Sequence, residues 1–262
     1  MDDGSTDDTA KVAASLGARV ITQRNSGPAV ARNMGINVAE NEWVALLDAD
    51  DRWFPEKLEQ QSGLCLQADI VYTGVVIEHE SNGLTTCATA LPPSKLWPML
   101  LYRNPVCPST VLARRQMLLQ IPFMNGRKGC EDWDCWVRAY RVGARFACVP
   151  EPLVYYREAA SGSVSSTGEK MLADFLQILE PTLLDGMKGW TRWSWRRRIF
   201  ASQLFSAAMI ERARGRIGLE TKYLLHAVLK WPPPFFRPER YYSLAYRLLK
   251  PWKRLESART TR

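Results

Sequence analysis

This sequence is poor in histidine and lacks paired cysteines and long apolar runs. The chain has two histidines, His79 and His226, and none of its six cysteines forms a CxxC pair, which excludes the familiar zinc sites. No run of about 18 apolar residues occurs and no signal peptide opens the chain, so the sequence predicts no transmembrane helix. We therefore expect mostly buried, reduced thiols and a cytoplasmic location.

Two further absences narrow the class of protein. The 262 residues contain no internal repeat and no low-complexity tract, and 46% of them are hydrophobic, which indicates a globular protein with one substantial core and a smaller appendage. A Gly-rich loop with Arg or Lys near the start is also missing. A nucleotidyltransferase on an α/β sheet would need such a loop for phosphate, so this class is disfavoured.

Charge is distributed unevenly along the chain. Residues 1–185 carry 17 Lys and Arg against 23 Asp and Glu, whereas residues 186–262 carry 18 against 4. An acidic front is typical of a site that uses a metal ion, and a basic end is typical of a segment that meets a membrane surface or a nucleic acid.

The first 50 residues alternate between helical and strand patterns. We expect a helix at 10–16, a strand at 19–22, a helix at 27–38 and a strand at 43–47, which is the βαβ signature of a parallel sheet. Further elements follow in this order: a helix beginning at Pro55, a strand 70–77, a loop or hairpin end 80–89, a helix 95–103, an extended segment 111–113, a helix 132–142, strands 145–148 and 153–156, and helices 171–184, 199–214 and 219–229.

An acidic cluster, Asp48-Ala49-Asp50-Asp51, directly follows the apolar strand 43–47. Its carboxylates lie at the end of the strand where open α/β sheets place their ligands. Clustered carboxylates repel one another unless a divalent cation lies among them, and oxygen ligands suit Mg²⁺ or Mn²⁺, which in turn would bind a diphosphate. The alternative is structural: Asp51 caps the helix that follows Pro55.

Two other segments carry weaker signals when taken alone. The segment NSGPAVARNMG, residues 25–35, opens a helix with a Gly-Pro turn and places Arg32 one turn further on, where a guanidinium can bind phosphate. The alternative is an exposed helix arginine. The segment DDGSTDDT, residues 2–9, has the composition of an ordinary turn and helix N-cap.

In this order, and with EDWDCWVR at residues 131–138, these segments resemble the family 2 glycosyltransferases. This large inverting GT-A group includes many bacterial polysaccharide and lipopolysaccharide enzymes. The resemblance covers roughly residues 2–165. It implies an α/β fold with a GT-A-like, mostly parallel sheet flanked by helices as the catalytic domain, residues 1–168, followed by a helical extension, residues 169–262.

The resemblance also implies roles for individual residues on the donor side. Asp3, with Asp2 beside it, would contact the base of the nucleotide, and Arg32 would approach the donor phosphates. Asp48 and Asp50 would hold the diphosphate and its Mn²⁺ or Mg²⁺ ion.

The acid pair Glu131-Asp132 corresponds to the family's catalytic base. In an inverting displacement the acceptor hydroxyl loses its proton as it attacks, and a nearby carboxylate can accept it. We assign this role to Asp132, with Glu131 as the second candidate; alternatively both acids only favour the helix N-terminus. Trp133 and Trp136 either stack on an acceptor sugar or, as we favour, pack in the core.

The two ends of the resemblance depart from the family pattern. Tyr155-Tyr156-Arg157 followed by residues 161–165 resembles the closing segment, but Glu158 stands near the position where many relatives have histidine. Relatives begin with a central strand and a nucleotide-lining turn ahead of the DDGS segment. We expect this chain to lack that first strand, with Met1 at an internal position read as a start, which would leave a sheet edge open.

The basic end interleaves indoles with guanidiniums over residues 190–198, 231–240 and 241–254. Such segments suit the surface of an anionic membrane, where the chain would be peripheral on the inner face; the alternative is a helical bundle with a solvated basic face. No nucleic-acid module surrounds them, so we expect no nucleic-acid partner.

The sequence thus predicts metal-assisted, inverting transfer of a sugar from a nucleotide-sugar donor to a hydroxyl acceptor, a glycan or lipid-linked glycan of the cell envelope. The hexosyltransferase type is expected. The alternative is a non-catalytic, truncated remnant that binds a membrane or a partner.

Overall fold

The computed structural model describes residues 1–80, 83–127, 129–158 and 167–231. The chain divides into two compact units. The first unit is Met1–Ser166 with Ala173–Gly186, and the second is Thr167–Leu172 with Met187–Arg262. The sites expected at residues 2–132 therefore all lie in the first unit.

The first unit opens with two helices, α1 (Thr9–Ser15) and α2 (Pro28–Val38). Gly27 precedes α2 in a left-handed conformation, with a φ of 89°, and Pro28 occupies the first helical position. The strand expected at 19–22 contributes a single parallel bridge, between Asp2 and Thr22. The residues on either side of Thr22 make the two hydrogen bonds of this bridge: the Asp2 N–H donates to the Ile21 carbonyl at 2.9 Å, and the Gln23 N–H donates to the Asp2 carbonyl at 2.9 Å.

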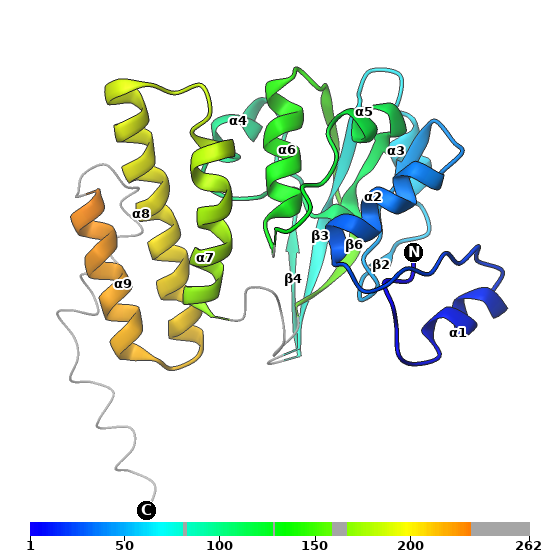
Figure 1. Ribbon diagram of the computed structural model, residues 1–262, viewed down its shortest axis with the longest axis horizontal. Coiled ribbons are helices and arrows are strands. Elements are labelled where there is room, and N and C mark those ends of the chain that lie inside the picture. Colours follow the sequence, from blue (N-terminus) through cyan, green and yellow to red (C-terminus); the bar gives the residue numbers. More distant parts are fainter. Residues whose placement is uncertain (81–82, 128, 159–166, 232–262) are drawn as a thin grey trace, which may run out of the picture. The chain divides into compact units, whose positions relative to one another are not determined.

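A six-stranded sheet forms the centre of the first unit (Figure 1). Its strands are paired in the order β1 (Trp43–Ala45), β5 (Leu112–Arg114), β3 (Ile70–His79), β6 (Phe146–Glu158) and β2 (Arg52–Trp53), with β4 (Leu84–Ala88) on β3.

The α/β class is confirmed, but the expectation of a mostly parallel sheet is wrong for the described residues. Only β3 and β6 run parallel, and the other four pairings are antiparallel. The reason is local: β3 and β4 form a hairpin, and β5 lies between β1 and β3 in the opposite direction to both. The expected strands 145–148 and 153–156 are one strand, β6, with irregular pairing near Pro152.

Short helices complete the first unit. They are α3 (Lys57–Ser62), α4 (Leu96–Met99), α5 (Arg115–Gln120), α6 (Glu131–Arg141), two 3₁₀ turns (Pro93–Lys95 and Pro108–Thr110) and a π-helical turn (Leu179–Leu183) that follows α7 (Gly168–Ile178). The helix expected at 95–103 is shorter because Trp97 and Pro98 leave helical geometry. Buried residues of β3, including Ile70, Val71 and Tyr72, and Trp136 of α6 belong to the core.

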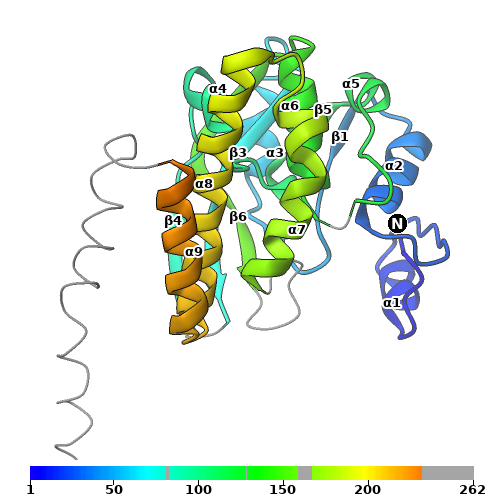
Figure 2. The same cartoon turned by 60° about the vertical axis from the view of Figure 1, so that its left-hand side comes forward.

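The second unit is a helical pair. Helices α8 (Gly189–Ala213) and α9 (Ile217–Lys230) run side by side in opposite directions, and α9 ends short of the first turns of α8 (Figure 1, Figure 2). Leu172, Leu204, Ala207 and Ala227 form its apolar core. Among the described residues, no helix combines the length and apolar character needed to span a membrane.

Candidate active site

A tight acidic turn follows β1. The Asp48 N–H donates to Ser109 Oγ at 3.0 Å, and the Asp51 N–H donates to the Asp48 carbonyl at 3.1 Å, which closes the turn. The Asp51 carboxylate is buried and accepts the Arg157 N–H at 3.0 Å, so it joins this turn to β6. Burial raises the pKa of Asp51. Asp51 does not cap the helix that follows Pro55, because this helix begins at Lys57 without a side-chain cap and the Asp51 carboxylate bonds to β6.

Arg32 joins this turn to the start of α6. Its guanidinium donates to Asp48 Oδ1 and to Glu131 Oε1, both at 2.7 Å, from a largely buried side chain. Burial acts to lower the pKa of Arg32, but the two carboxylates outweigh burial and raise it, so the arginine stays charged. Arg32 thereby brings together Asp48, 16 positions away in the sequence, and Glu131, 99 positions away. The interpretation of Arg32 as an exposed helix arginine is wrong, because its side chain is largely buried.

Asn33, the next residue, fixes α2 against a loop. Its Nδ2 donates to the Phe123 carbonyl at 2.8 Å, and its Oδ1 accepts the Phe123 N–H at 3.0 Å. The Phe123 ring in turn lies 5.5 Å from the Arg32 guanidinium carbon. This reciprocal pair holds the helix at the point from which Arg32 reaches both carboxylates.

Asp132 lies beside Glu131 but has different partners. Asn104 Nδ2 donates to Asp132 Oδ2 at 2.7 Å, and the Trp133 N–H donates to Asp132 Oδ1 at 2.7 Å. The Val106 N–H donates to Asn104 Oδ1 at 3.1 Å, which fixes which end of the Asn104 amide faces Asp132.

Removal from water, together with the charge of Glu131, raises the pKa of Asp132 to about 7, while Arg32 opposes the rise. The two carboxylates thus differ in their partners: Glu131 forms an ion pair with Arg32, and Asp132 forms none with the described residues. A carboxylate that titrates near neutral pH can accept and release a proton under physiological conditions, as a general base must.

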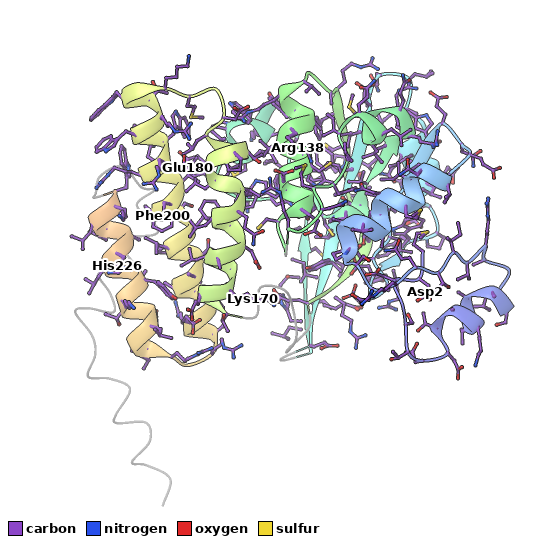
Figure 3. All side chains as sticks on the ribbon, in the orientation of Figure 1. Asp2, Arg138, Lys170, Glu180, Phe200 and His226 are labelled. Carbon is purple, nitrogen blue, oxygen red and sulfur yellow. The ribbon has the colours of Figure 1, made fainter. Side chains whose placement is uncertain are left out.

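Asp2 and Asp3 lie at the N-terminal end of the chain, where Figure 3 labels Asp2. Asp2 Oδ1 accepts the Ser5 N–H at 3.0 Å, and hydrogen bonds from Ser5 lower the pKa of Asp2. Asp3 accepts Gln23 Nε2 at 2.7 Å, the Ser26 N–H at 2.9 Å and the Gly27 N–H at 2.8 Å. Partial removal from water acts against it, but these bonds lower the pKa of Asp3 overall. Asp3 thereby ties the DDGS turn to the start of α2.

Asp50 is the exposed carboxylate of the acidic turn, and its side chain has no hydrogen bond or ion pair with the described residues. Asp51 Oδ2 is buried without a hydrogen-bond partner among those residues. Of the three carboxylates of this turn, those of Asp48, Asp50 and Asp51, only that of Asp48 has an ion pair among the described residues, with Arg32.

This surplus of negative charge fits a divalent cation. Among the described residues, no group of three or more His, Cys, Asp or Glu side chains is arranged to hold a metal. Mg²⁺ and ions like it need only one or two protein carboxylates when phosphate oxygens and water complete the shell, so a site of this kind requires no larger cluster.

The remaining residues predicted near the site have structural partners. Trp133 and Trp136 are buried, and their indole N–H groups donate to the carbonyls of Leu100 at 2.6 Å and Val106 at 3.0 Å, which confirms core packing. Asp134, also buried, pairs with Arg138, labelled in Figure 3, at 2.7 Å. Residues 161–165 of the expected closing segment lie outside the described residues.

Comparison with known proteins identifies the family. The sequence model of glycosyl transferase family 2 matches residues 1–120. The UDP-Glc:alpha-D-GlcNAc-diphosphoundecaprenol beta-1,3-glucosyltransferase WfaP of Escherichia coli is 31% identical over 184 residues, which are 68% of this chain and 72% of the relative. The chain belongs to glycosyltransferase family 2.

Solved structures confirm the GT-A fold of this family 2 glycosyltransferase. S. aureus TarS in complex with UDP-GlcNAc superposes with a TM-score of 0.55 at 17% identity, over 95% of this chain and 82% of that one. The mannosyltransferase PcManGT from Pyrobaculum calidifontis, with GDP-Man and Mn²⁺, gives a TM-score of 0.55 at 15% identity, over 98% and 72%. Two longer relatives, uncharacterized glycosyltransferases of Rickettsia conorii and Rickettsia felis, are matched by this chain over 24% of their length.

Proposed function

We propose that this family 2 glycosyltransferase catalyses inverting transfer of a hexosyl group from a nucleotide sugar to a hydroxyl acceptor, with Asp132 as the general base. One observation carries the proposal: a single guanidinium, that of Arg32, joins the acidic turn to α6 at Glu131, next to a carboxylate that titrates near pH 7. The catalytic unit in this proposal is residues 1–168, and residues 169–262 are its extension.

The donor side of the site is assigned to the acidic turn and α2. A guanidinium has five N–H donors, and the ion pairs of Arg32 with Asp48 and Glu131 use two of them, so the others are available to donor phosphate. Asp3, held against the start of α2, and Asp2 beside it border the proposed position of the nucleotide base.

Asp132 accepts the proton of the acceptor hydroxyl. As the oxygen attacks the anomeric carbon, the bond from that carbon to the diphosphate oxygen breaks, and the hydroxyl proton passes to a carboxylate oxygen of Asp132. The configuration at the anomeric carbon inverts because attack and departure occur on opposite faces. Asn104 and the Trp133 N–H keep the carboxylate in place during the transfer.

Asp50 and Asp48 are the residues that would hold Mn²⁺ or Mg²⁺. The bound ion supplies charge neutralisation for the departing diphosphate without any proton transfer. The support for this assignment is the exposed, unpaired Asp50 carboxylate in a turn with excess negative charge. The fold neighbour PcManGT was solved with Mn²⁺, which agrees with this choice of ion.

We assign the acceptor to the glycans of the cell envelope, either free or lipid-linked. The name of WfaP describes transfer of glucose from UDP-Glc to a diphosphoundecaprenol-linked sugar, and this relative supports a lipid-linked acceptor here. With such an acceptor we propose a cytoplasmic location, peripheral on the inner face of the membrane.

The test is release of nucleoside diphosphate from a panel of UDP- and GDP-sugars with Mn²⁺, in the presence and absence of undecaprenyl-diphosphate-linked GlcNAc. We expect acceptor-dependent release with at least one donor. Asp50→Ala should lower kcat/KM by at least about 100-fold, because the developing charge on the leaving group is no longer offset.

The matched control for Asp50→Ala is Asp8→Ala, another exposed carboxylate, which pairs with the neighbouring Lys11 at 2.7 Å. It should retain wild-type activity within about twofold. An Asp50→Ala enzyme as active as Asp8→Ala, with and without chelator, would remove the metal from the proposal.

A further inference from the structure

One end of the α8–α9 pair presents aromatic rings and cations together. Trp190 and Trp193, in the first turns of α8, stack with ring centroids 4.4 Å apart. The guanidinium of Arg197 lies 5.0 Å from the Trp193 ring and donates to the Leu229 carbonyl of α9 at 2.9 Å. We call this set, Trp190, Trp193, Arg197 and Leu229, the aromatic end of the helical pair.

The aromatic end exposes a large apolar area to solvent. Trp190 is 74% exposed, Trp193 46% and Leu229 72%. Single exposed apolar residues are ordinary, but two stacked, exposed indoles form a contiguous apolar group of the kind that marks interaction sites.

The charge around this end has one sign. Residues 187–231 contain ten Lys and Arg and two acids, Glu211 and Glu220. Both acids are buried, and Glu211 is used inside the unit, where it accepts the Gly168 N–H at 2.7 Å and pairs with Arg216 at 2.9 Å. The side-chain charge that this segment exposes is therefore all positive.

We propose that the aromatic end of the α8–α9 pair docks on the surface of a bilayer that contains anionic phospholipid. The indoles insert at headgroup level, and the cations, including Lys188 and Lys230, neutralise lipid phosphates. The assignment deepens the peripheral location given under the proposed function, on which it rests.

The geometry favours lipid over nucleic acid as the occupant. A nucleobase binds by stacking on an open aromatic face. Trp193 already contacts the Trp190 ring and the Arg197 guanidinium, so its ring surface is in use. Arg198 lies 4.8 Å from the Trp195 ring and 5.5 Å from the Trp231 ring, which reduces the surface that these two indoles offer for stacking. Indoles at a bilayer need no free face, because their apolar edges enter the headgroup region.

The experiment is flotation of the full chain with vesicles of phosphatidylcholine, alone or with about one third phosphatidylglycerol, at about 0.15 M salt. Flotation needs no donor, acceptor or turnover, so its outcome is independent of whether the chain transfers sugar. We expect binding to the anionic vesicles at least about tenfold tighter than to the neutral ones.

The variant Trp190→Ser/Trp193→Ser should lose at least about tenfold in affinity for anionic vesicles, because both indoles are removed from the interface. The control is Ile217→Ser, since Ile217 is 62% exposed at the opposite end of the pair, and its affinity should stay within about twofold. Lys188→Glu should also weaken binding more than Lys222→Glu, an exposed lysine of α9 placed away from this end.

Three results would overturn the proposal: no binding of the wild type to anionic vesicles, equal binding by the double Trp variant, or equal losses in Ile217→Ser. Binding of single-stranded oligonucleotide that depends on Trp190 and Trp193, without vesicle binding that depends on them, would reassign the surface to nucleic acid.

Discussion

Asp132 and Glu131 are neighbours in sequence, but their surroundings give them different chemistry. Glu131 Oε1 is paired with the Arg32 guanidinium at 2.7 Å. Among the described residues, Asp132 accepts hydrogen bonds from two neutral donors, Asn104 Nδ2 and the Trp133 N–H, and its pKa is raised to about 7 by removal from water and by the adjacent Glu131 charge. Because of this difference in surroundings, we assign the role of general base to Asp132 and not to Glu131.

The role of Asn104 can be measured through the pH dependence of kcat/KM. In the wild type, kcat/KM should rise with pH to a plateau, with a midpoint near pH 7, because the base works only when deprotonated. Asn104→Ala removes a hydrogen bond that favours the charged carboxylate, so the midpoint should move to higher pH by about 1 unit.

Asn41→Ala, at an exposed asparagine of the first unit, is the control and should leave the midpoint in place. A lower kcat/KM in Asn104→Ala with an unmoved midpoint would show that Asn104 acts on folding or substrate binding and not on the Asp132 proton.

The residues of the site were predictable from the sequence to different degrees. Arg32, Asp48 and Glu131 each stand in a recognisable motif, and the structure brings all three together. Asn104 was not predictable, because it stands 28 positions before Asp132 in a segment without a motif, and only the fold brings it near. Asn33 could be suspected of a role in the site because it stands beside Arg32. Its hydrogen-bond partner could not be predicted, because Phe123 is 90 positions away in the sequence.

At the scale of elements, the centre of the sheet depends on one glycine. Gly74 of β3 lies where its pairing with β6 shifts register. A Cβ at this position would lie 2.6 Å from the Ala88 carbonyl oxygen and 2.9 Å from the Pro150 carbonyl oxygen. Both atoms belong to backbone, so the clash cannot be relieved by rotating a side chain.

Gly74→Ala should therefore destabilise the first unit by about 2 kcal/mol or more, which thermal unfolding would register as a fall in Tm of several degrees. Gly63→Ala is the control, because Gly63 has a helical φ of −60° and its nearest neighbour would be 3.8 Å from a Cβ. It should be neutral or slightly stabilising. Equal Tm values for the two variants would contradict the close approach at Gly74.

The elements themselves were predictable where their pattern was strong and local. Periodicity predicted α2, α6 and β3 within a few residues of their observed bounds. It failed where tertiary pairing decides the outcome: residues 19–22 supply one bridge and not a strand, and the direction of β5 is set by its position between β1 and β3. Short apolar runs carry no information on direction.

At the scale of the whole molecule, the two units carry opposite charge for separate tasks. The acidic first part, residues 1–185, holds the proposed donor and base residues, and the basic second part, residues 186–262, holds the proposed lipid surface. Loss of vesicle binding through Trp190 and Trp193 should therefore leave transfer to a water-soluble acceptor unchanged, whereas changes at Asp132 should leave vesicle binding unchanged.

The most direct test of the account is the transfer rate of Asp132→Asn at pH 8, measured beside donor affinity by calorimetry and beside Glu131→Gln. The account predicts that kcat of Asp132→Asn falls by about 100-fold or more while donor affinity stays within about threefold, because the amide keeps the shape of the carboxylate but cannot accept the proton. Retention of kcat within about tenfold in Asp132→Asn, with a large loss in Glu131→Gln and unchanged donor affinity, would contradict it and move the base to Glu131.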